Sequence, residues 1–129
     1  MAQVKVYGLK DHLQKVQDLL STTIHTTIVE VLSFPQEKRF HRFIGFEKEQ
    51  MLFPEEKSGA YMIIEIYMME GRTVETKKQL IKTLFSNISQ TLETDVDDIE
   101  ILIIESPASN WGFRGMTGDE IRLDYRVDI

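Results

Sequence analysis

One arginine stands at a position that suits the binding of an anion. Arg72 follows the apolar run Ala60–Glu70 and directly precedes Thr73, a residue type that favours the start of a helix. Helix starts carry partial positive charge, and a guanidinium can bind both oxygens of a carboxylate. Arg72 is therefore a candidate for holding a carboxylate ligand. The alternative is a surface arginine that stabilises a turn.

A glycine-punctuated segment near the end of the chain, Asn110–Glu120, contains the only tryptophan. Trp111 and Phe113 could form the wall of a pocket, and Arg114 could clamp an anion there. The alternatives are aromatic packing at a subunit interface and a solvated arginine. The spacing Gly112–Gly115 also fits the GxxG loop of nucleic-acid-binding KH domains, but that loop joins two helices, whereas this segment follows a strand and a proline. The segment therefore predicts no nucleic-acid site.

A basic cluster and a helical histidine complete the candidates. Lys38 and Arg39 belong to the cluster Lys38–Arg42, which the pattern places on a strand, and both are candidates for contact with an anionic substrate. His25 lies at the edge of an apolar helical stripe, where a hydrogen-bonded structural histidine is the safer interpretation and a catalytic role is the alternative. The three histidines are too dispersed to predict a metal site, and the P-loop, nucleophile-elbow and HExxH motifs are missing. We expect neither a metal nor a cofactor.

The composition narrows the class of protein. With 129 residues the chain suits a single domain, and its net charge of −6 argues against nucleic acid as a main partner, because phosphate binding needs clustered Lys and Arg. The lack of cysteine excludes disulfides and thiolate chemistry. The first residues lack the apolar run of a signal peptide, and no apolar segment reaches the roughly 20 residues that span a membrane. The sequence thus predicts a cytoplasmic protein without membrane contact.

Hydrophobic periodicity predicts four strands and two helices. Alternating or continuous apolar runs predict strands at Gln3–Leu9, Phe40–Glu47, Ala60–Glu70 and Ile99–Ser106. Apolar residues at steps of three and four predict a helix over Lys10–Leu32 and a second helix that starts after Thr73. The β-branched residues of the first helix weaken that pattern, because they lose rotamer freedom in a helix.

The order of these elements is an imperfect internal duplication. Two β-α-β halves, at about residues 1–50 and 58–106, precede a C-terminal hairpin and tail at residues 107–129. Right-handed crossovers place both helices on one face of a four-stranded mixed sheet, so the fold class is α+β (α/β) with two fused β-α-β units in a single domain, residues 1–129. The other face would be apolar and uncovered, which predicts oligomerisation. The period-two tail Arg122–Ile129 could add a strand to the sheet of a neighbour.

The duplicated halves and three short motifs resemble the tautomerase superfamily. The motifs are EGRT before the second helix (Glu70–Thr73), FP after the first (Phe34–Pro35) and NWGF in the glycine-rich segment (Asn110–Phe113). The resemblance covers nearly the whole chain; it is greatest to the malonate semialdehyde decarboxylase branch, and cis-3-chloroacrylic acid dehalogenase is a more distant relative. It implies a homotrimer of fused β-α-β units that binds a small carboxylate, a 2-keto or enol acid, without a cofactor.

The resemblance also implies where the catalytic group should lie. The family uses an amino-terminal proline, whose secondary amine acts as general base or acid in keto–enol tautomerisation. Counting without gaps from Phe34–Pro35 places that position at Ala2. Removal of the methionine before this alanine would supply a primary α-amine, with a reference pKa of about 7.7–8.0. Burial beside an arginine lowers the pKa of such an amine, so Ala2 is the candidate base, without the rigidity of proline.

The other family positions are partly kept. Arg72 matches one of the two arginines that hold the substrate carboxylate in the decarboxylase, and the second falls at Glu70. The decarboxylase's water-activating aspartate falls at Lys38, whereas the dehalogenase's helical histidine falls at His25. The aromatic pair of the glycine-rich segment matches the pocket wall. The resemblance thus implies a partly retained anion-binding half of the site and an altered proton-transfer half.

Three functional hypotheses follow. The first is a tautomerase-like enzyme with weak or altered proton transfer, in which Ala2 is the base, Arg72 the carboxylate clamp and the aromatic pair the wall. The second is a catalytically silent trimer that binds a small carboxylate or a protein partner. The third is a ferredoxin-like regulatory domain unrelated to tautomerases, which would form a dimer. Because alanine stands at the proline position, the sequence predicts the family fold and leaves family catalysis open.

Overall fold

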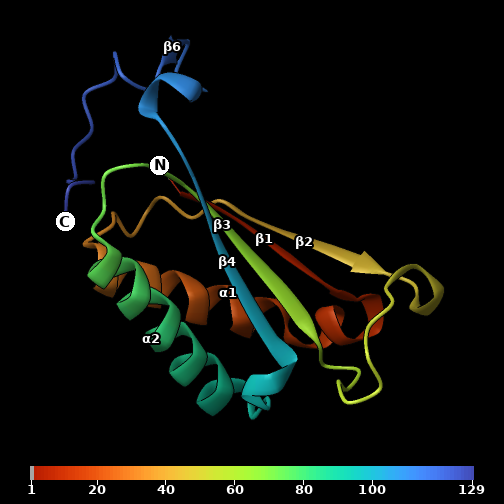
Figure 1. Cartoon of the computed structure of the whole chain (residues 1–129). Helices are drawn as coiled ribbons and strands as arrows, with labels where there is room; N and C mark the ends of the chain where they lie inside the picture. Colours follow the sequence, from red (N-terminus) through yellow and green to blue (C-terminus); the bar gives the residue numbers. More distant parts are fainter. Residues whose placement is uncertain (1) are drawn as a thin grey trace.

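The computed structural model describes residues 2–129 as a layer of sheet and a layer of helices, with a short hairpin beyond them (Figure 1). The elements are β1 (Ala2–Leu9), α1 (Lys10–Leu32), β2 (His41–Phe46), β3 (Met62–Met69), α2 (Val74–Leu92), β4 (Ile99–Ser106), β5 (Gly112–Phe113) and β6 (Met116–Thr117). Single turns of 3-10 helix lie between β2 and β3, before β4 and before β5. The four predicted strands and both helices are present, and α1 has the predicted bounds.

The four long strands form one mixed sheet in the order β2-β1-β3-β4. β1 is parallel to β2 and β3 is parallel to β4, so each β-α-β unit contributes a parallel pair. The two units meet in the antiparallel pairing of β1 with β3, where Ala2 lies opposite Met68 and Gly8 lies opposite Met62. Both helices cover the same face of the sheet (Figure 1), which confirms the predicted fold class.

Local geometry sets the helix ends that lie near the candidate site. Thr73 caps the start of α2, because its side-chain oxygen accepts a hydrogen bond from the Thr76 backbone N–H at 3.1 Å. α1 ends at Ser33, which is left-handed with a φ of 50°, and Pro35 could not continue the helix. Each helix buries an apolar stripe, formed by Leu13, Leu20, Ile24, Ile28 and Leu32 in α1 and by Leu80, Leu84 and Ile88 in α2.

The core lies between the sheet and the helices. Side chains alternate along the two central strands, so that Val4, Val6, Ile64 and Ile66 are buried against the helices and are at most 1% exposed. A polar contact also joins the two helices, where the Asn87 side-chain amide donates to the Thr27 hydroxyl oxygen at 2.9 Å. The apolar stripes and this contact fix the helix layer against one sheet face.

The opposite face of the sheet is uncovered, and the prediction that it is apolar is wrong at its centre. Leu102 is apolar there and 53% exposed. Between it and β1, however, Glu65 accepts hydrogen bonds at Oε1 from the hydroxyl groups of Tyr7 at 2.9 Å and Tyr67 at 2.8 Å. The uncovered face is therefore mixed, with one carboxylate held by two phenols on its two central strands.

Residues 121–129 pair with no strand of their own chain, and the prediction that the tail adds a strand to the sheet of a neighbour stays a prediction. Residues 121–129 run back to the start of α2 on the same chain (Figure 1). The Ile129 backbone oxygen accepts hydrogen bonds from the hydroxyl groups of Thr73 at 3.2 Å and Thr76 at 2.5 Å. The period-two pattern reflects packing onto the subunit itself, since the partly buried residues of the tail are Ile121, Leu123, Tyr125, Val127 and Ile129.

Candidate functional site

One end of the two central strands brings the two main candidate residues together. Because β1 and β3 are antiparallel, the start of β1 at Ala2 and the end of β3 at Met69 lie at the same end of the sheet. Arg72 follows β3 after Gly71, whose φ of +138° strongly favours glycine. Ala2 is 4% exposed and Arg72 is 5% exposed, so both are buried there. We call this end of the sheet, with Ala2 and Arg72, the site edge.

The Arg72 guanidinium is buried without a hydrogen-bonded counter-ion. None of its three nitrogens has a hydrogen-bond partner within residues 2–129. Burial lowers the pKa of Arg72, and the nearby Tyr125 and Glu105 act to raise it. Glu105 is already bonded to Lys77, with Nζ 2.7 Å from Oε1, so its charge is shared with a second cation. Because an unpaired guanidinium is costly to bury, this group suits an anion with two oxygens.

A cavity of about 170 Å³ lies near the site edge, lined by Lys38, Phe40, Phe113, Arg114, Leu123 and Tyr125. It brings together three residues predicted for substrate binding, from the segment before β2 and from the hairpin. Lys38 Nζ bonds Asp124 Oδ1 at 2.9 Å and lies 4.9 Å from the centre of the Tyr125 ring. The Arg114 guanidinium lies 5.6 Å from the Phe113 ring. The cavity thus combines two cations with an aromatic and apolar lining.

Tyr125 is the functional candidate that sequence reasoning missed. Its ring packs edge-on against Phe34 with ring centres 4.8 Å apart, and its hydroxyl is buried without a partner in the described part of the chain. Burial raises the pKa of Tyr125, and the charge of Arg72 opposes this shift. The available signal was the period-two tail, in which Tyr125 is the aromatic residue on the inward side.

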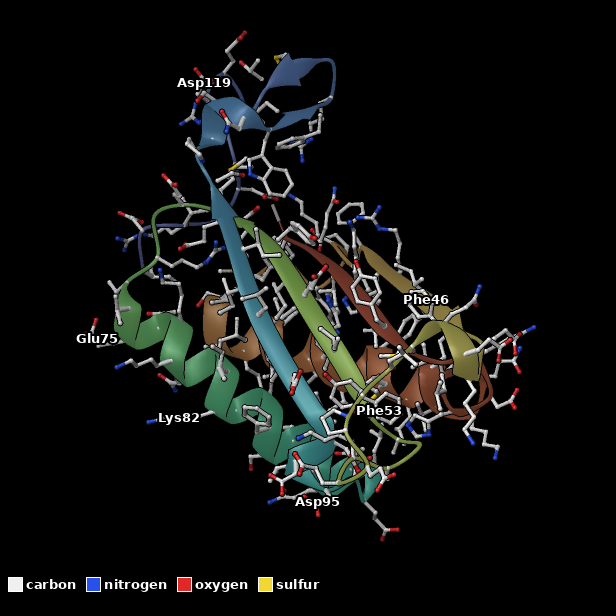
Figure 2. The ribbon with its side chains drawn as sticks, turned by 45° about the vertical axis from the view of Figure 1, so that its right-hand side comes forward. Phe46, Phe53, Glu75, Lys82, Asp95 and Asp119 are labelled. Carbon is white, nitrogen blue, oxygen red and sulfur yellow. The ribbon has the colours of Figure 1, made fainter. Side chains whose placement is uncertain are left out.

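Trp111 joins the hairpin to the end of β4 and is absent from the lining of the 170 Å³ cavity. Its backbone oxygen accepts a hydrogen bond from the Gly118 N–H at 2.7 Å, which closes the segment that contains β5 and β6. Asp119, labelled in Figure 2, lies just after this hairpin, beyond the end of β4. A place for Trp111 in the pocket wall stays a prediction.

We expect Gly118→Ala to lower the free energy of unfolding by about 1–3 kcal/mol, the usual cost of overpacking. A Cβ at this position would lie 2.8 Å from Met69 Cε and 3.0 Å from Trp111 Cβ, and closer still to the Ala108 carbonyl oxygen. Gly59→Ala is the matched control, since no described atom lies within 4 Å of the added Cβ there. Urea unfolding compares the two variants, and equal midpoints would contradict this tight packing of the hairpin.

His25 is buried in α1 and fixes the loop that follows the helix. Its Nε2 lies 2.6 Å from the Gln36 carbonyl oxygen, which can only accept, so this nitrogen carries the proton. The ring is 2% exposed and meets His41 edge-on, with ring centres 5.8 Å apart. This geometry agrees with the structural interpretation of His25. Its catalytic role stays a prediction.

The neighbouring His41 predicts a dependence of stability on pH. Burial, followed by the charges of His25 and Arg39, lowers the pKa of His41 from 6.5 to about 4. Between these two pH values the unfolded chain binds a proton that the folded protein does not, so stability is lost as the pH falls through this window. His41→Gln, which keeps a polar group for the Ser21 hydroxyl at Nδ1, should flatten this part of the profile.

Urea unfolding at several pH values, from about 7.5 down to about 4.5, measures the effect at one protein concentration. Other groups that titrate in this range act on both proteins, so the difference between wild type and His41→Gln isolates His41. Parallel profiles for the two proteins would show that His41 contributes nothing to the loss.

Arg39 does not line the cavity that contains Lys38. It lies in a separate surface depression with Gln3, Phe40, His41 and Arg42. Residues 38–40 precede β2, so their predicted place on the strand is wrong and strand alternation does not orient them. Contact of Arg39 with a substrate stays a prediction.

The polar groups near the site edge are mostly hydrogen-bond donors. Arg72, Lys38, Arg114 and the Tyr125 hydroxyl offer protons to an acceptor, which suits an organic anion. Residues 2–129 contain no group of three or more His, Cys, Asp or Glu side chains that could hold a metal ion. Within the same range, no helix combines the length and the apolar character needed to cross a bilayer.

Comparison with known proteins identifies relatives across much of the chain. The family model described as "Tautomerase enzyme" matches residues 38–114, which is more than half of the sequence. The "Probable tautomerase YusQ" of Bacillus subtilis (strain 168) is 25% identical over 99 residues, covering 73% of this chain and 78% of that protein.

Two solved structures share the fold. A malonate semialdehyde decarboxylase inhibited by 3-bromopropiolate has a TM-score of 0.76 at 21% identity, over 86% of this chain and 88% of that chain. A fused 4-OT described as a wild-type asymmetric trimer has a TM-score of 0.80 at 19% identity, over 91% of this chain and 96% of that chain. These likenesses concern the fold, and the family match adds the sequence. The resemblance seen in the EGRT and NWGF motifs is confirmed: this chain belongs to the tautomerase enzyme family.

Proposed function

We propose that this protein binds a small carboxylate, a 2-oxo or enol acid, at Arg72 and catalyses weak tautomerase-type proton transfer on it. The observation that best supports the proposal is the buried guanidinium, whose nitrogens lack partners among residues 2–129. A carboxylate would satisfy these donors and neutralise the charge. Arg114 in the neighbouring cavity adds positive potential that attracts an anion, whereas the charge of Lys38 is shared with Asp124.

Ala2 supplies the acid–base group in this proposal. Removal of Met1 leaves Ala2 with a primary α-amine at the same sheet edge as Arg72. The neutral amine takes a proton from C3 of a 2-oxo acid and becomes an ammonium, while the C–H electron pair becomes the C2=C3 double bond and the C=O π pair moves to the oxygen. Water protonates that oxygen, and the ammonium returns its proton to water. Ketonisation returns a proton to C3, so the composition is unchanged. A primary amine lacks the ring that orients a proline nitrogen, and weak transfer is therefore expected.

The cavity lining favours an acid with an apolar substituent. Phe40, Phe113 and Leu123 supply apolar surface, and the volume of about 170 Å³ limits the ligand to a small molecule. Phenylpyruvate carries a 2-oxo group, a carboxylate and one aromatic ring, so it is a suitable probe.

The proposed assembly is a homotrimer. A fused 4-OT with the same fold is described as a trimer, and the uncovered sheet face exposes 53% of Leu102. Association through this face would remove apolar area from water. Size-exclusion chromatography with light scattering should give about three times the 15.0 kDa mass of the chain. The family match already excludes the ferredoxin-like alternative, so a dimer mass would contradict the proposed trimer alone.

The alternative function is a catalytically silent trimer that binds the same class of carboxylate or a protein partner. The alanine at position 2 favours it, because the secondary amine is missing. Enolisation of phenylpyruvate, followed by absorbance, and thermal unfolding with and without phenylpyruvate distinguish the two functions, once intact mass has shown that Met1 is removed. Turnover with thermal stabilisation supports the enzyme, and stabilisation alone supports the silent module. The absence of both turnover and thermal stabilisation would contradict a carboxylate site at Arg72.

A further inference from the structure

Three polar groups near the site edge are buried without a partner in the described chain: the Arg72 guanidinium, the Tyr125 hydroxyl and Trp111 Nε1. The first two come from distant parts of the sequence. Arg72 follows β3, whereas Tyr125 lies in the tail. Buried donors of this kind are rare in folded proteins, because an unmade hydrogen bond in the interior is costly. A ligand with an acceptor for each group would account for both.

Contacts on its ring hold Tyr125 in place. The Phe34 ring lies edge-on to it with centres 4.8 Å apart, and Lys38 Nζ lies 4.9 Å from its centre. Phe34 is itself 4% exposed and belongs to the core. The aromatic ring is therefore positioned by packing that does not involve its hydroxyl group.

The tail also brings Tyr125 towards the segment that carries Arg72. The Val127 carbonyl oxygen lies 3.0 Å from the position that a Cβ would take at Gly71, the residue before Arg72. Tyr125 and Val127 are alternate residues on the inward side of the tail. Tyr125 and Arg72 are close enough for the charge of each to affect the ionisation of the other.

The Tyr125 hydroxyl is available as a donor at neutral pH. Burial raises the pKa of Tyr125 above its ordinary value of 10.0 and outweighs the opposing charges of Arg72 and Arg114. The phenol therefore keeps its proton, as the guanidinium does, and the site presents two kinds of donor.

We propose that Tyr125 is a specificity-determining residue, whose hydroxyl donates a hydrogen bond to the C2 oxygen of a 2-oxo acid while Arg72 binds the carboxylate. The inference rests on the function proposed for Arg72. A guanidinium that binds a carboxylate through two hydrogen bonds engages both of its oxygens, and the acceptor that remains nearby is the oxygen on C2. A hydrogen bond to that oxygen also stabilises the negative charge that develops there when C3 loses a proton.

A comparison of two acids tests the role of Tyr125. Phenylpyruvate and 3-phenylpropionate share the ring and the carboxylate, but only phenylpyruvate has the 2-oxo group. We expect the wild-type protein to bind freshly dissolved phenylpyruvate about fivefold to tenfold more tightly, as one hydrogen bond allows. In Tyr125→Phe this preference should disappear while the affinity for 3-phenylpropionate stays unchanged, because the ring contacts with Phe34 and Lys38 remain. Calorimetric titration measures all four affinities.

Tyr61→Phe is the matched control. The Tyr61 hydroxyl donates to Glu100 at the opposite edge of the sheet, where β3 begins. Its removal should lower the urea midpoint and leave the preference for phenylpyruvate intact. Tyr125→Phe should not lower the midpoint, because the hydroxyl that it removes has no partner within residues 2–129.

The outcomes separate this inference from the proposed function. If Arg72→Lys weakens binding of both acids while Tyr125→Phe keeps the full preference for phenylpyruvate, the carboxylate site stands and the role of Tyr125 is wrong. Equal affinity of the wild type for the two acids also overturns the role of Tyr125. If the wild type binds neither acid, the proposed function fails and this inference fails with it.

Discussion

We expect Arg72→Met to be more stable than the wild type and to bind carboxylates about 100-fold more weakly. Methionine keeps a flexible unbranched stem but removes a guanidinium that has no partner within residues 2–129. Removal of this buried unpaired group should raise the free energy of unfolding by about 1–3 kcal/mol. It also removes two charge-assisted hydrogen bonds to the ligand. At the low end of their net value, about 1.5 kcal/mol each, the two together correspond to a factor of about 100.

Urea unfolding and calorimetric titration with phenylpyruvate measure the two effects of Arg72→Met. Arg122 is an exposed arginine of the tail, so Arg122→Met is the matched control and should change neither quantity. Unchanged affinity in Arg72→Met would refute the carboxylate site. A loss of stability would show that the guanidinium has a partner in solution, such as a group from a neighbouring subunit.

The second large effect is expected at the start of β1. Ala2→Pro should increase phenylpyruvate tautomerisation roughly 100-fold, which is the lower end of the contribution of a well-placed acid–base group. Proline supplies a secondary amine and a ring that restricts the position of the nitrogen. It is tolerated as the first residue of a strand, and Ala2 begins β1 opposite Met68. The rate of enol formation, measured by absorbance, gives the comparison.

Ala2→Ser is the control for this gain, because it also permits removal of Met1 but retains a primary amine. Its activity should stay near that of the wild type. Intact mass must show the same processed terminus in each protein. If Ala2→Pro is processed and folded but shows no gain, the rest of the pocket is not competent for proton transfer, and the silent carboxylate-binding module becomes the better description.

Much of the fold could be predicted because it depends on local patterns. The apolar stripe of α1 and the capping residue Thr73 gave helix positions that the structure contains, and the order of elements gave the paired β-α-β units. The right-handed crossover rule then placed both helices on one face. Arg72 was found as a candidate for the same reason, since a strand–helix junction is visible in sequence.

The rest depended on contacts that no local pattern specifies. Alternation in the tail indicated a strand, but the same alternation arises when Tyr125 and Val127 pack onto the chain's own surface. Tyr125 was therefore missed. Arg39 and Lys38 are neighbours in sequence, yet they line different depressions. Both residues precede β2, so strand alternation does not orient their side chains. Alternation along β3 places Glu65 and Tyr67 on one face, but the contact of Glu65 with Tyr7 depends on the pairing of β3 with β1.

Glu65 also limits which chains can assemble on the uncovered sheet face. Its Oε1 accepts from Tyr7 and Tyr67, so any surface that covers this face must leave the carboxylate hydrated or supply a further donor. A related subunit that places an apolar residue opposite it would leave a poorly solvated charge, at a cost of several kcal/mol. In a cell that contains several paralogues of one fold, a single charge of this kind disfavours mixed oligomers. The face can then have enough apolar area for self-association and still discriminate against related subunits.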